Sequence, residues 1–192
     1  MTDPNDRPIL NIIGDKVALG PLRRELLQLY ERWINDFVVV QTLGAGLRPI
    51  TSESEAAWFE RAAASERDVT FTIYELQSVR PIGTVSLREI DYFHRAATFG
   101  LLIGEKECWG KGYGTETTRL MVDYAFGGLG LHNVMLAVSP RNEHAVHAYR
   151  RAGFREIGRR REAHRFLGQA EDVILMDSVA TDFERPNVRW NL

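Results

Sequence analysis

The chain has 192 residues, of which 44% are apolar and 26% charged, and its formal net charge is −2. This composition is ordinary for a water-soluble globular domain and shows no basic excess of the kind that binds nucleic acid. A single cysteine excludes an internal disulfide framework, the first residues are too polar for a signal peptide, and no apolar run approaches a membrane span. We therefore expect one cytoplasmic domain, residues 1–192, with no nucleic-acid or membrane partner.

The N-terminal part of the chain predicts two helices behind a first strand. Apolar residues at helical spacing indicate the first helix, and Ser52 with Glu55 forms a capping box that starts the second. In chain order we expect a loose arm (residues 1–13), a strand (Lys16–Pro21), a helix (Leu22–Asn35), a segment without helical period (Phe37–Pro49) and a helix that continues to Ala63.

From Val69 onward the pattern is that of strands. Val69–Leu76 alternates between polar and apolar residues, Gln77–Pro81 is a turn, and Ile82–Ile90 is the return strand of a hairpin. The later elements are a strand (Ala96–Ile103), a helix (Thr115–Phe126) ended by Gly127, Gly128 and Gly130, a strand around Val134, a short helix that carries Tyr149, and two strands (Phe154–Arg165 and Asp172–Thr181). Residues 182–192 form a C-terminal extension that either folds back or docks on a neighbouring subunit. This order predicts an α+β fold with helices on the faces of a sheet.

A glycine-rich turn lies between the Ala96–Ile103 strand and the helix that begins near Thr115. Its glycines let the backbone approach a ligand without any Cβ in the way. The free N–H groups and the positive dipole end of the helix face the same turn. The turn comprises Gly110, Gly112 and Gly114, separated by Lys111 and Tyr113. The pattern suits phosphate oxygens, although it matches neither a P-loop nor a dinucleotide fingerprint.

A second stretch, Asn133–Gly153, reads as a strand, a stop at Pro140 and a short helix. Asn142 is placed to cap that helix, and Gly153 ends it. Together the two stretches resemble the GNAT superfamily of acetyl-CoA-dependent N-acetyltransferases, and within it the branch of ribosomal-protein N-terminal and spermidine acetyltransferases. The turn is similar to the pyrophosphate motif Q/R-x-x-G-x-G/A, with Trp109 in place of Arg or Gln. The second stretch is similar to the segment V-x-P-x-N-x-x-A-x-x-x-Y-x-x-x-G-F, which falls on Val138, Pro140, Asn142, Ala145, Tyr149, Gly153 and Phe154.

The resemblance implies a mixed, mostly antiparallel seven-stranded sheet with helices on both faces and splayed central strands. It also implies that the pantetheine arm of acetyl-CoA lies between those strands like an added strand, while backbone N–H groups of the turn hold the pyrophosphate. The residues that it assigns to acetyl-CoA are Leu101, Leu102 and Ile103 on the strand, Trp109, Gly110, Lys111, Gly112, Tyr113, Gly114 and Thr115 at the turn, and Asn142 and Ala145 on the next helix. Lys111 either adds charge at the phosphates or is a solvated lysine, and Asn142 either only caps its helix or also contacts the pantetheine arm.

Tyr149 is the residue expected to act as general acid. By the resemblance it faces the cofactor sulfur, and a tyrosine with its ordinary pKa near 10 is protonated at neutral pH and donates to a thiolate. The alternative is a plain core aromatic. The general base stays open among Glu105, Glu89 and His94, which flank the central strands, and Glu105 directly follows the strand assigned to the pantetheine arm.

Cys108 lies beside the turn and raises the question of a covalent acetyl-cysteine. No partner histidine is placed to activate it, so we expect a plain thiol. The five histidines show no metal-ligand spacing, and we expect no metal.

The acceptor side is less defined. Gly158–Arg165 is a basic run, and Glu171 with Asp172 is an acidic pair. They form either a solvated hairpin with cross-strand ion pairs or, as the resemblance implies, a wall of the acceptor pocket. A basic wall suits an acceptor with a carboxylate better than a polycation, and the N-terminal helices show no dense acidic patch for spermidine. Phe37–Pro49 is either a loop near the acceptor or a connector.

We expect an enzyme that moves acetyl from acetyl-CoA to a primary amine by direct attack in a ternary complex. The acceptor is a small amine, a protein N-terminal amine or an amine-bearing antibiotic, and a small molecule is favoured because the chain has no separate docking domain. The alternative is a non-catalytic acyl-CoA-binding sensor on the same fold, which would lack an acid such as Tyr149. The resemblance is compatible with a homodimer.

Overall fold

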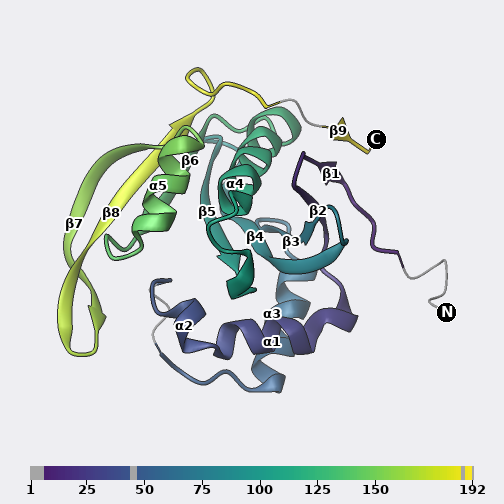
Figure 1. Cartoon of the computed structure of the whole chain (residues 1–192). Helices are drawn as coiled ribbons and strands as arrows, with labels where there is room; N and C mark the ends of the chain where they lie inside the picture. The colour runs from purple at the N-terminus through teal and green to yellow at the C-terminus, as the bar shows by residue number, and fades with distance from the viewer. Residues whose placement is uncertain (1–6, 44–46, 187–188, 192) are drawn as a thin grey trace.

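The computed structural model of the chain describes residues 7–43, 47–186 and 189–191. In this part the strands form one nine-stranded sheet in the order β7-β8-β6-β5-β4-β3-β2-β1-β9 (Figure 1). The strands are β1 (Ile12–Ile13), β2 (Val17–Pro21), β3 (Val69–Glu75), β4 (Arg80–Asp91), β5 (Ala96–Ile103), β6 (Asn133–Val138), β7 (Arg155–Phe166), β8 (Gln169–Val179) and β9 (Arg189–Trp190). The helices are α1 (Leu27–Asn35), α2 (Phe37–Val40), α3 (Ser52–Ala63), α4 (Tyr113–Asp123) and α5 (Glu143–Arg151).

Two central strands separate partway along their length. Antiparallel pairing joins β2, β3, β4 and β5, whereas β5 and β6 run parallel and pair only over Ala96–Thr98 and Asn133–Met135. Beyond this point, among the described strands, β5 pairs only with β4, as far as Ile103, and β6 pairs only with β8, as far as Val138. The expected splay is confirmed, and it leaves unpaired backbone groups on the facing edges of both strands.

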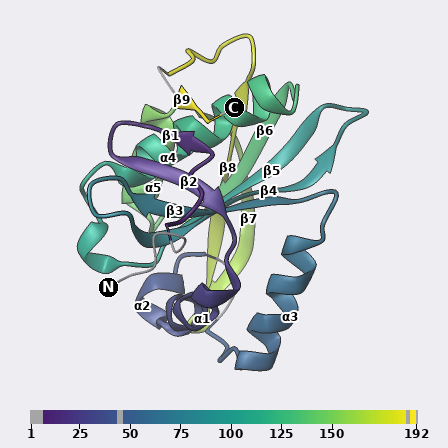
Figure 2. The same cartoon turned by 90° about the vertical axis from the view of Figure 1, so that its right-hand side faces the viewer.

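Helices cover both faces of the sheet, as expected (Figures 1 and 2). Because strand side chains alternate between faces, neighbouring residues of β3 meet different helices. Ile73 lies in the large core cluster to which α4 contributes Leu120, whereas the hydroxyl of Thr72 lies 2.6 Å from that of Tyr30 on α1. A smaller cluster with Phe59 joins α1 to α3. The chain therefore has a core on each side of the sheet.

The predicted count of seven strands is wrong, because two very short strands extend one edge of the sheet. Ile12–Ile13, expected within a loose arm, forms β1 against β2, and Ile12 is buried. The C-terminal extension folds back, so that Arg189–Trp190 forms β9 against β1. Strands of two residues show no alternation in the sequence, and segments far apart in the chain make this pairing.

A buried carboxylate in α4 anchors the returning C-terminal segment. Arg185 donates to Asp123 at 2.6 and 3.3 Å, and Trp190 Nε1 donates to it at 3.3 Å. A Cβ on Gly127 would lie 2.5 Å from the Arg185 side chain, and one on Gly128 would lie 2.7 Å from that of Trp190. These glycines therefore leave room for the returning chain.

The first helix differs from its prediction. Its α-helical part begins at Leu27 instead of Leu22, after a 3-10 turn over Arg24–Leu26. Phe37–Pro49, predicted without helical period, contains the short helix α2, because Asp36 caps it and Val39 and Val40 pack inward. Residues 44–46 of that segment lie outside the described residues.

The second helix has a different cap from the one predicted. The hydroxyl of Thr51 accepts a hydrogen bond from the Ser54 N–H at 3.2 Å, so Ser52 is the first helical residue and not the cap. Glu55 is only 7% exposed and does not take part in a capping box. Among the helices that the structure describes, none is long and apolar enough to cross a bilayer.

Candidate active site

The splay of β5 and β6 opens directly onto the glycine-rich turn. Leu101, Leu102 and Ile103 pair with β4 on one side only, so alternate N–H and C=O groups face the gap. Trp109 Nε1 donates to the Ile103 carbonyl at 2.9 Å. The tryptophan that replaces Arg or Gln in the expected motif thus fastens the turn to the end of β5.

The turn presents unpaired backbone donors. Gly110 and Gly112 have φ of 74° and 86°, and Gly112 is the left-handed residue before α4, so the helix begins at Tyr113 instead of near Thr115. Within the described residues, the N–H groups of residues 110–115 have no hydrogen-bond acceptor. Such a run of converging N–H groups at a helix start favours anions.

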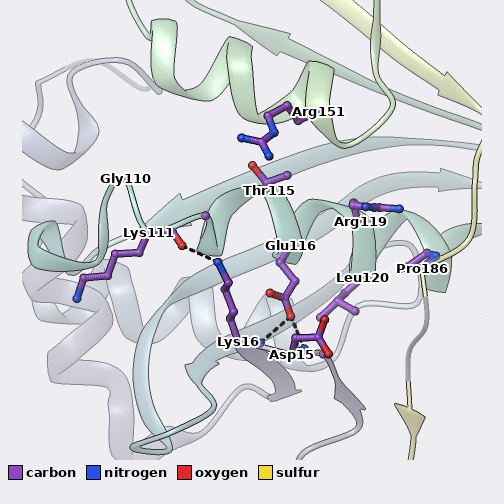
Figure 3. Close-up of a pocket in the computed structure, with 12 residues that line it drawn as sticks. Asp15, Lys16, Gly110, Lys111, Thr115, Glu116, Arg119, Leu120, Arg151 and Pro186 are labelled. Atoms are coloured by element: carbon purple, nitrogen blue, oxygen red, sulfur yellow. Dashed lines mark hydrogen bonds between the residues drawn. The ribbon is translucent and has the colours of Figure 1, made fainter.

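Lys16 supports the turn from the connection between β1 and β2. Its Nζ donates to the Lys111 carbonyl at 3.2 Å and would lie 3.3 Å from a Cβ on Gly112 (Figure 3). Glu116 fixes the same corner, because one of its oxygens accepts from the N–H groups of Asp15 at 2.6 Å and Lys16 at 2.9 Å. The turn is thereby tied to the β1–β2 connection as well as to β5.

A cavity of about 510 Å³ adjoins the turn and continues along α4. It carries four cationic side chains and two carboxylates. Its lining residues are Gly14, Asp15, Lys16, Gly110, Lys111, Gly112, Thr115, Glu116, Arg119, Leu120, Arg151 and Pro186.

Tyr149 lies on α5 in an apolar setting. Its ring is 5.8 Å from that of Phe99 on β5 and 6.0 Å from that of Phe154, measured between centroids. Burial raises the pKa of Tyr149 to about 12, above the ordinary value that we expected from the sequence. In the described part of the chain its hydroxyl has no hydrogen-bond partner, yet the oxygen is not among the fully buried unpaired atoms. The neutral hydroxyl is therefore unpaired among the described residues and not completely buried, in otherwise apolar surroundings.

Asn142 caps α5, as predicted. Its Oδ1 accepts from the Ala145 N–H at 3.1 Å, and its Nδ2 donates to the Thr42 hydroxyl at 2.8 Å. The segment after α2 therefore reaches the start of the helix that carries Tyr149. The side-chain amide keeps one further hydrogen to donate.

The three candidate bases lie apart from one another. Glu105 Oε1 accepts from Arg32 and, at 2.8 Å, from Trp33 Nε1, at the end of β5 where α1 packs. His94 pairs with Asp91 in the β4–β5 turn, and Glu89 accepts from Thr98 at 3.3 Å. Only Glu105 lies at the same end of β5 as the glycine-rich turn.

Cys108 is buried beside the turn, and its closest polar partner is Arg80 at 3.4 Å. Burial raises the pKa of the thiol, which opposes a nucleophilic role. Among the described residues no group of three or more His, Cys, Asp or Glu side chains is arranged to hold a metal ion. The expected absence of a metal stays a prediction.

The basic hairpin does not form the cross-strand ion pairs that the sequence suggested. Glu171 pairs with Arg141, which precedes α5, at 2.9 Å, and Arg159 pairs with Glu156 of its own strand at 2.9 Å. The arginine of the first pair also lies over the Phe166 ring, 3.8 Å from its centroid. The hairpin is thus tied to the start of the Tyr149 helix.

Sequence reasoning missed one acidic group in the N-terminal helices. Glu55 is buried, and its carboxylate has no hydrogen-bond partner in the described structure; burial, followed by the charge of Glu31, raises its pKa to about 7. The position was interpreted as a capping residue because the pattern S-x-x-E imitates a capping box. No local signal distinguishes a buried glutamate on a helix face from a capping one.

Comparison with known proteins gives a consistent family. A model of the acetyltransferase (GNAT) domain matches residues 16–155. Spermidine N(1)-acetyltransferase of Vibrio cholerae is 40% identical over 92 residues, which are 48% of this chain and 53% of that protein. The Escherichia coli K12 enzyme of the same name is 38% identical over 94 residues, 49% and 50% of the two chains. The chain thus spans about half the length of these curated relatives.

The solved structures match over more of the chain. Spermidine N-acetyltransferase from Vibrio cholerae, in complex with CoA and spermine, is similar with a TM-score of 0.81 and 27% identity over 88% of this chain and 98% of that chain. The enzyme from the same organism in complex with manganese ions has a TM-score of 0.71 and 28% identity, over 85% and 92% of the two chains.

Proposed function

The chain belongs to the GNAT acetyltransferase family, and from this we propose that it moves the acetyl group of acetyl-CoA to a primary amine. The observation that carries the proposal is the run of N–H groups at residues 110–115, which have no acceptor in the described part of the chain and lie at the open end of the β5–β6 gap. An anionic head and an amide-rich arm are the two ligand features that these sites would accept.

The residues present fit acetyl-CoA. The N–H groups of the turn would hold the pyrophosphate. The backbone groups of Leu101–Ile103 that face the gap would pair with the pantetheine amides, beside the bond that Trp109 makes to the Ile103 carbonyl. The coenzyme, when bound, supplies a thioester carbonyl for attack by the amine. Apolar neighbours around Tyr149 exclude water from the reacting end, which favours transfer to the amine over hydrolysis.

Tyr149 would keep its hydroxyl proton and direct it toward the leaving sulfur. Its pKa of about 12 keeps the hydroxyl protonated at neutral pH. An ordinary thiol has a pKa of about 8.5, so complete proton transfer from the tyrosine to a thiolate is uphill by roughly 5 kcal/mol. Tyr149 therefore acts by donating a hydrogen bond to the developing thiolate.

Glu105 stays our proposed base. Both of its donors bind Oε1, so Oε2 is free among the described residues to accept the proton of the attacking amine, directly or through a water. The ion pair with Arg32 and the bond to Trp33 would orient that oxygen.

A small amine is the acceptor that we favour over a protein N-terminus. The relatives named above act, by their names, on spermidine, and Glu31 on α1, together with the partly ionised Glu55 on α3, adds negative charge to the N-terminal helices. This reverses the preference for a carboxylate-bearing acceptor that the basic hairpin suggested. A cytoplasmic location and a homodimer remain predictions.

The test is Tyr149→Phe, compared with Tyr92→Phe at the exposed β4–β5 turn as the matched control. Titration calorimetry with CoA and a thiol-release assay with an amine panel measure binding and turnover separately. We expect Tyr149→Phe to retain CoA affinity and to lose about 10²-fold or more in kcat. Retention of kcat would refute the role of Tyr149. CoA binding without turnover of any amine by the unmodified protein would instead favour the acyl-CoA sensor.

A further inference from the structure

Two arginines line the cavity beyond the glycine-rich turn and have no partner among the described residues. They are Arg119 on α4 and Arg151 at the last turn of α5. Other arginines around the same two helices are engaged: Arg150 pairs with Glu156, and Arg185 pairs with Asp123. Among the described arginines of α4 and α5, the two without a partner thus both lie in the cavity wall.

Their placement follows from helix geometry. Arg119 lies four residues after Thr115, on the same face of α4 and about 6 Å further along its axis. Arg151 extends from α5 toward Thr115 (Figure 3). The two side chains therefore lie beyond the backbone donors of residues 110–115, on the path along which the cavity continues.

The carboxylates of the cavity do not compensate these arginines. Glu116 extends from α4 and already accepts from the N–H groups of Asp15 and Lys16, and Asp15 itself lies in the connection between β1 and β2. In Figure 3 Asp15 and Glu116 lie toward Lys16, away from Arg151. The side of the cavity between α4 and α5 is consequently cationic.

We propose that Arg119 and Arg151 form a second phosphate site, which takes the 3′-phosphate on the coenzyme ribose. The inference rests on the proposed function, because the backbone donors of the turn account for the pyrophosphate alone. A phosphomonoester carries a charge of about −1.5 to −2 at pH 7, and guanidinium groups bind such oxygens in pairs. The protein would thereby distinguish CoA from 3′-dephospho-CoA.

The test is titration calorimetry of CoA and 3′-dephospho-CoA with the unmodified protein, Arg119→Gln and Arg151→Gln. Arg161→Gln, on the exposed part of β7 outside the cavity, is the matched control. We expect the unmodified protein to prefer CoA by about 10-fold, since the pairs are charge-assisted but partly exposed. Each cavity variant loses most of this preference and binds 3′-dephospho-CoA as the unmodified protein does.

The outcomes separate this inference from the proposed function. Equal affinity of the unmodified protein for both ligands refutes the second phosphate site and leaves the acetyltransferase proposal intact. If the variants lose affinity equally for both ligands, the arginines bind the pyrophosphate, and this result also refutes the second phosphate site. Failure of the unmodified protein to bind either ligand overturns both proposals. Because the unmodified protein is titrated with both ligands, this comparison does not depend on whether the variants fold.

Discussion

Replacing Glu55 with glutamine should stabilise the protein at neutral and alkaline pH but hardly at acidic pH. The folded-state pKa of Glu55 is about 7 against an ordinary 4.5, because burial and then the Glu31 charge disfavour the carboxylate. A pKa raised on folding contributes stability that is complete below the unfolded value and lost as pH rises toward the folded value. The difference of about 2.5 pH units therefore costs the native protein roughly 3 kcal/mol above pH 7. Glutamine, which stays neutral, avoids this cost.

The assay is thermal unfolding at pH 5 and pH 8.5. At pH 8.5 we expect Glu55→Gln to raise Tm by about 6–12 °C. At pH 5 the increase in the free energy of unfolding should fall to less than about 1 kcal/mol, and the increase in Tm should shrink with it. Glu66→Gln, on an exposed loop, is the control and should change Tm little at either pH. A stabilisation that is equal at both pH values would refute the reasoning, because it would not arise from ionisation.

Two further predictions concern carboxylates at the ends of β5 and α4. Glu105→Gln should lower kcat at neutral pH, and kcat should recover at alkaline pH, where the amine is already deprotonated. A pH–rate profile that does not differ from that of the unmodified protein would exclude Glu105 as the base. The control is Glu107→Gln, which disturbs the neighbouring ion pair with Arg80. Asp123→Asn should destabilise the protein by about 1–3 kcal/mol in chemical denaturation and speed proteolysis of the C-terminal segment, because it weakens the contacts to Arg185 and Trp190. Cleavage at the unmodified rate would show that the segment is held by other contacts.

The parts of the fold that a local pattern specifies were predicted well. Ala96–Ile103 has the predicted bounds of β5, and Asn142 caps its helix, because apolar runs, alternation and cap residues act over a few neighbours. The short strands β1 and β9 were missed, since their pairing joins residues at opposite ends of the chain. Gly127 and Gly128 were interpreted as helix-ending residues, whereas they also leave room for side chains more than 50 residues away in sequence.

In the candidate site, too, the features that a local motif specifies were predicted, whereas those that depend on tertiary packing were not. The glycine turn and Tyr149 follow spaced motifs, and the structure brings the turn to the open end of the β5–β6 gap. The environment of each group follows from packing and was not predicted: the raised pKa of Tyr149 needs the rings of Phe99 and Phe154, and the partners of Glu105 lie on α1. A motif identifies which residues can react, and the surrounding contacts decide their protonation.

The position of β8 between β6 and β7 has a consequence for synthesis on the ribosome. β8 comes after α5 and β7 in the chain, yet it supplies the antiparallel partner of β6 along its whole length. A nascent chain that has released only the residues before Gln169 can assemble the β2–β5 meander and the glycine turn, but it exposes an open edge on β6. The β6 side of the sheet is therefore the last to be completed, and a chain that stalls before β8 would present the glycine-rich turn beside an unfinished sheet.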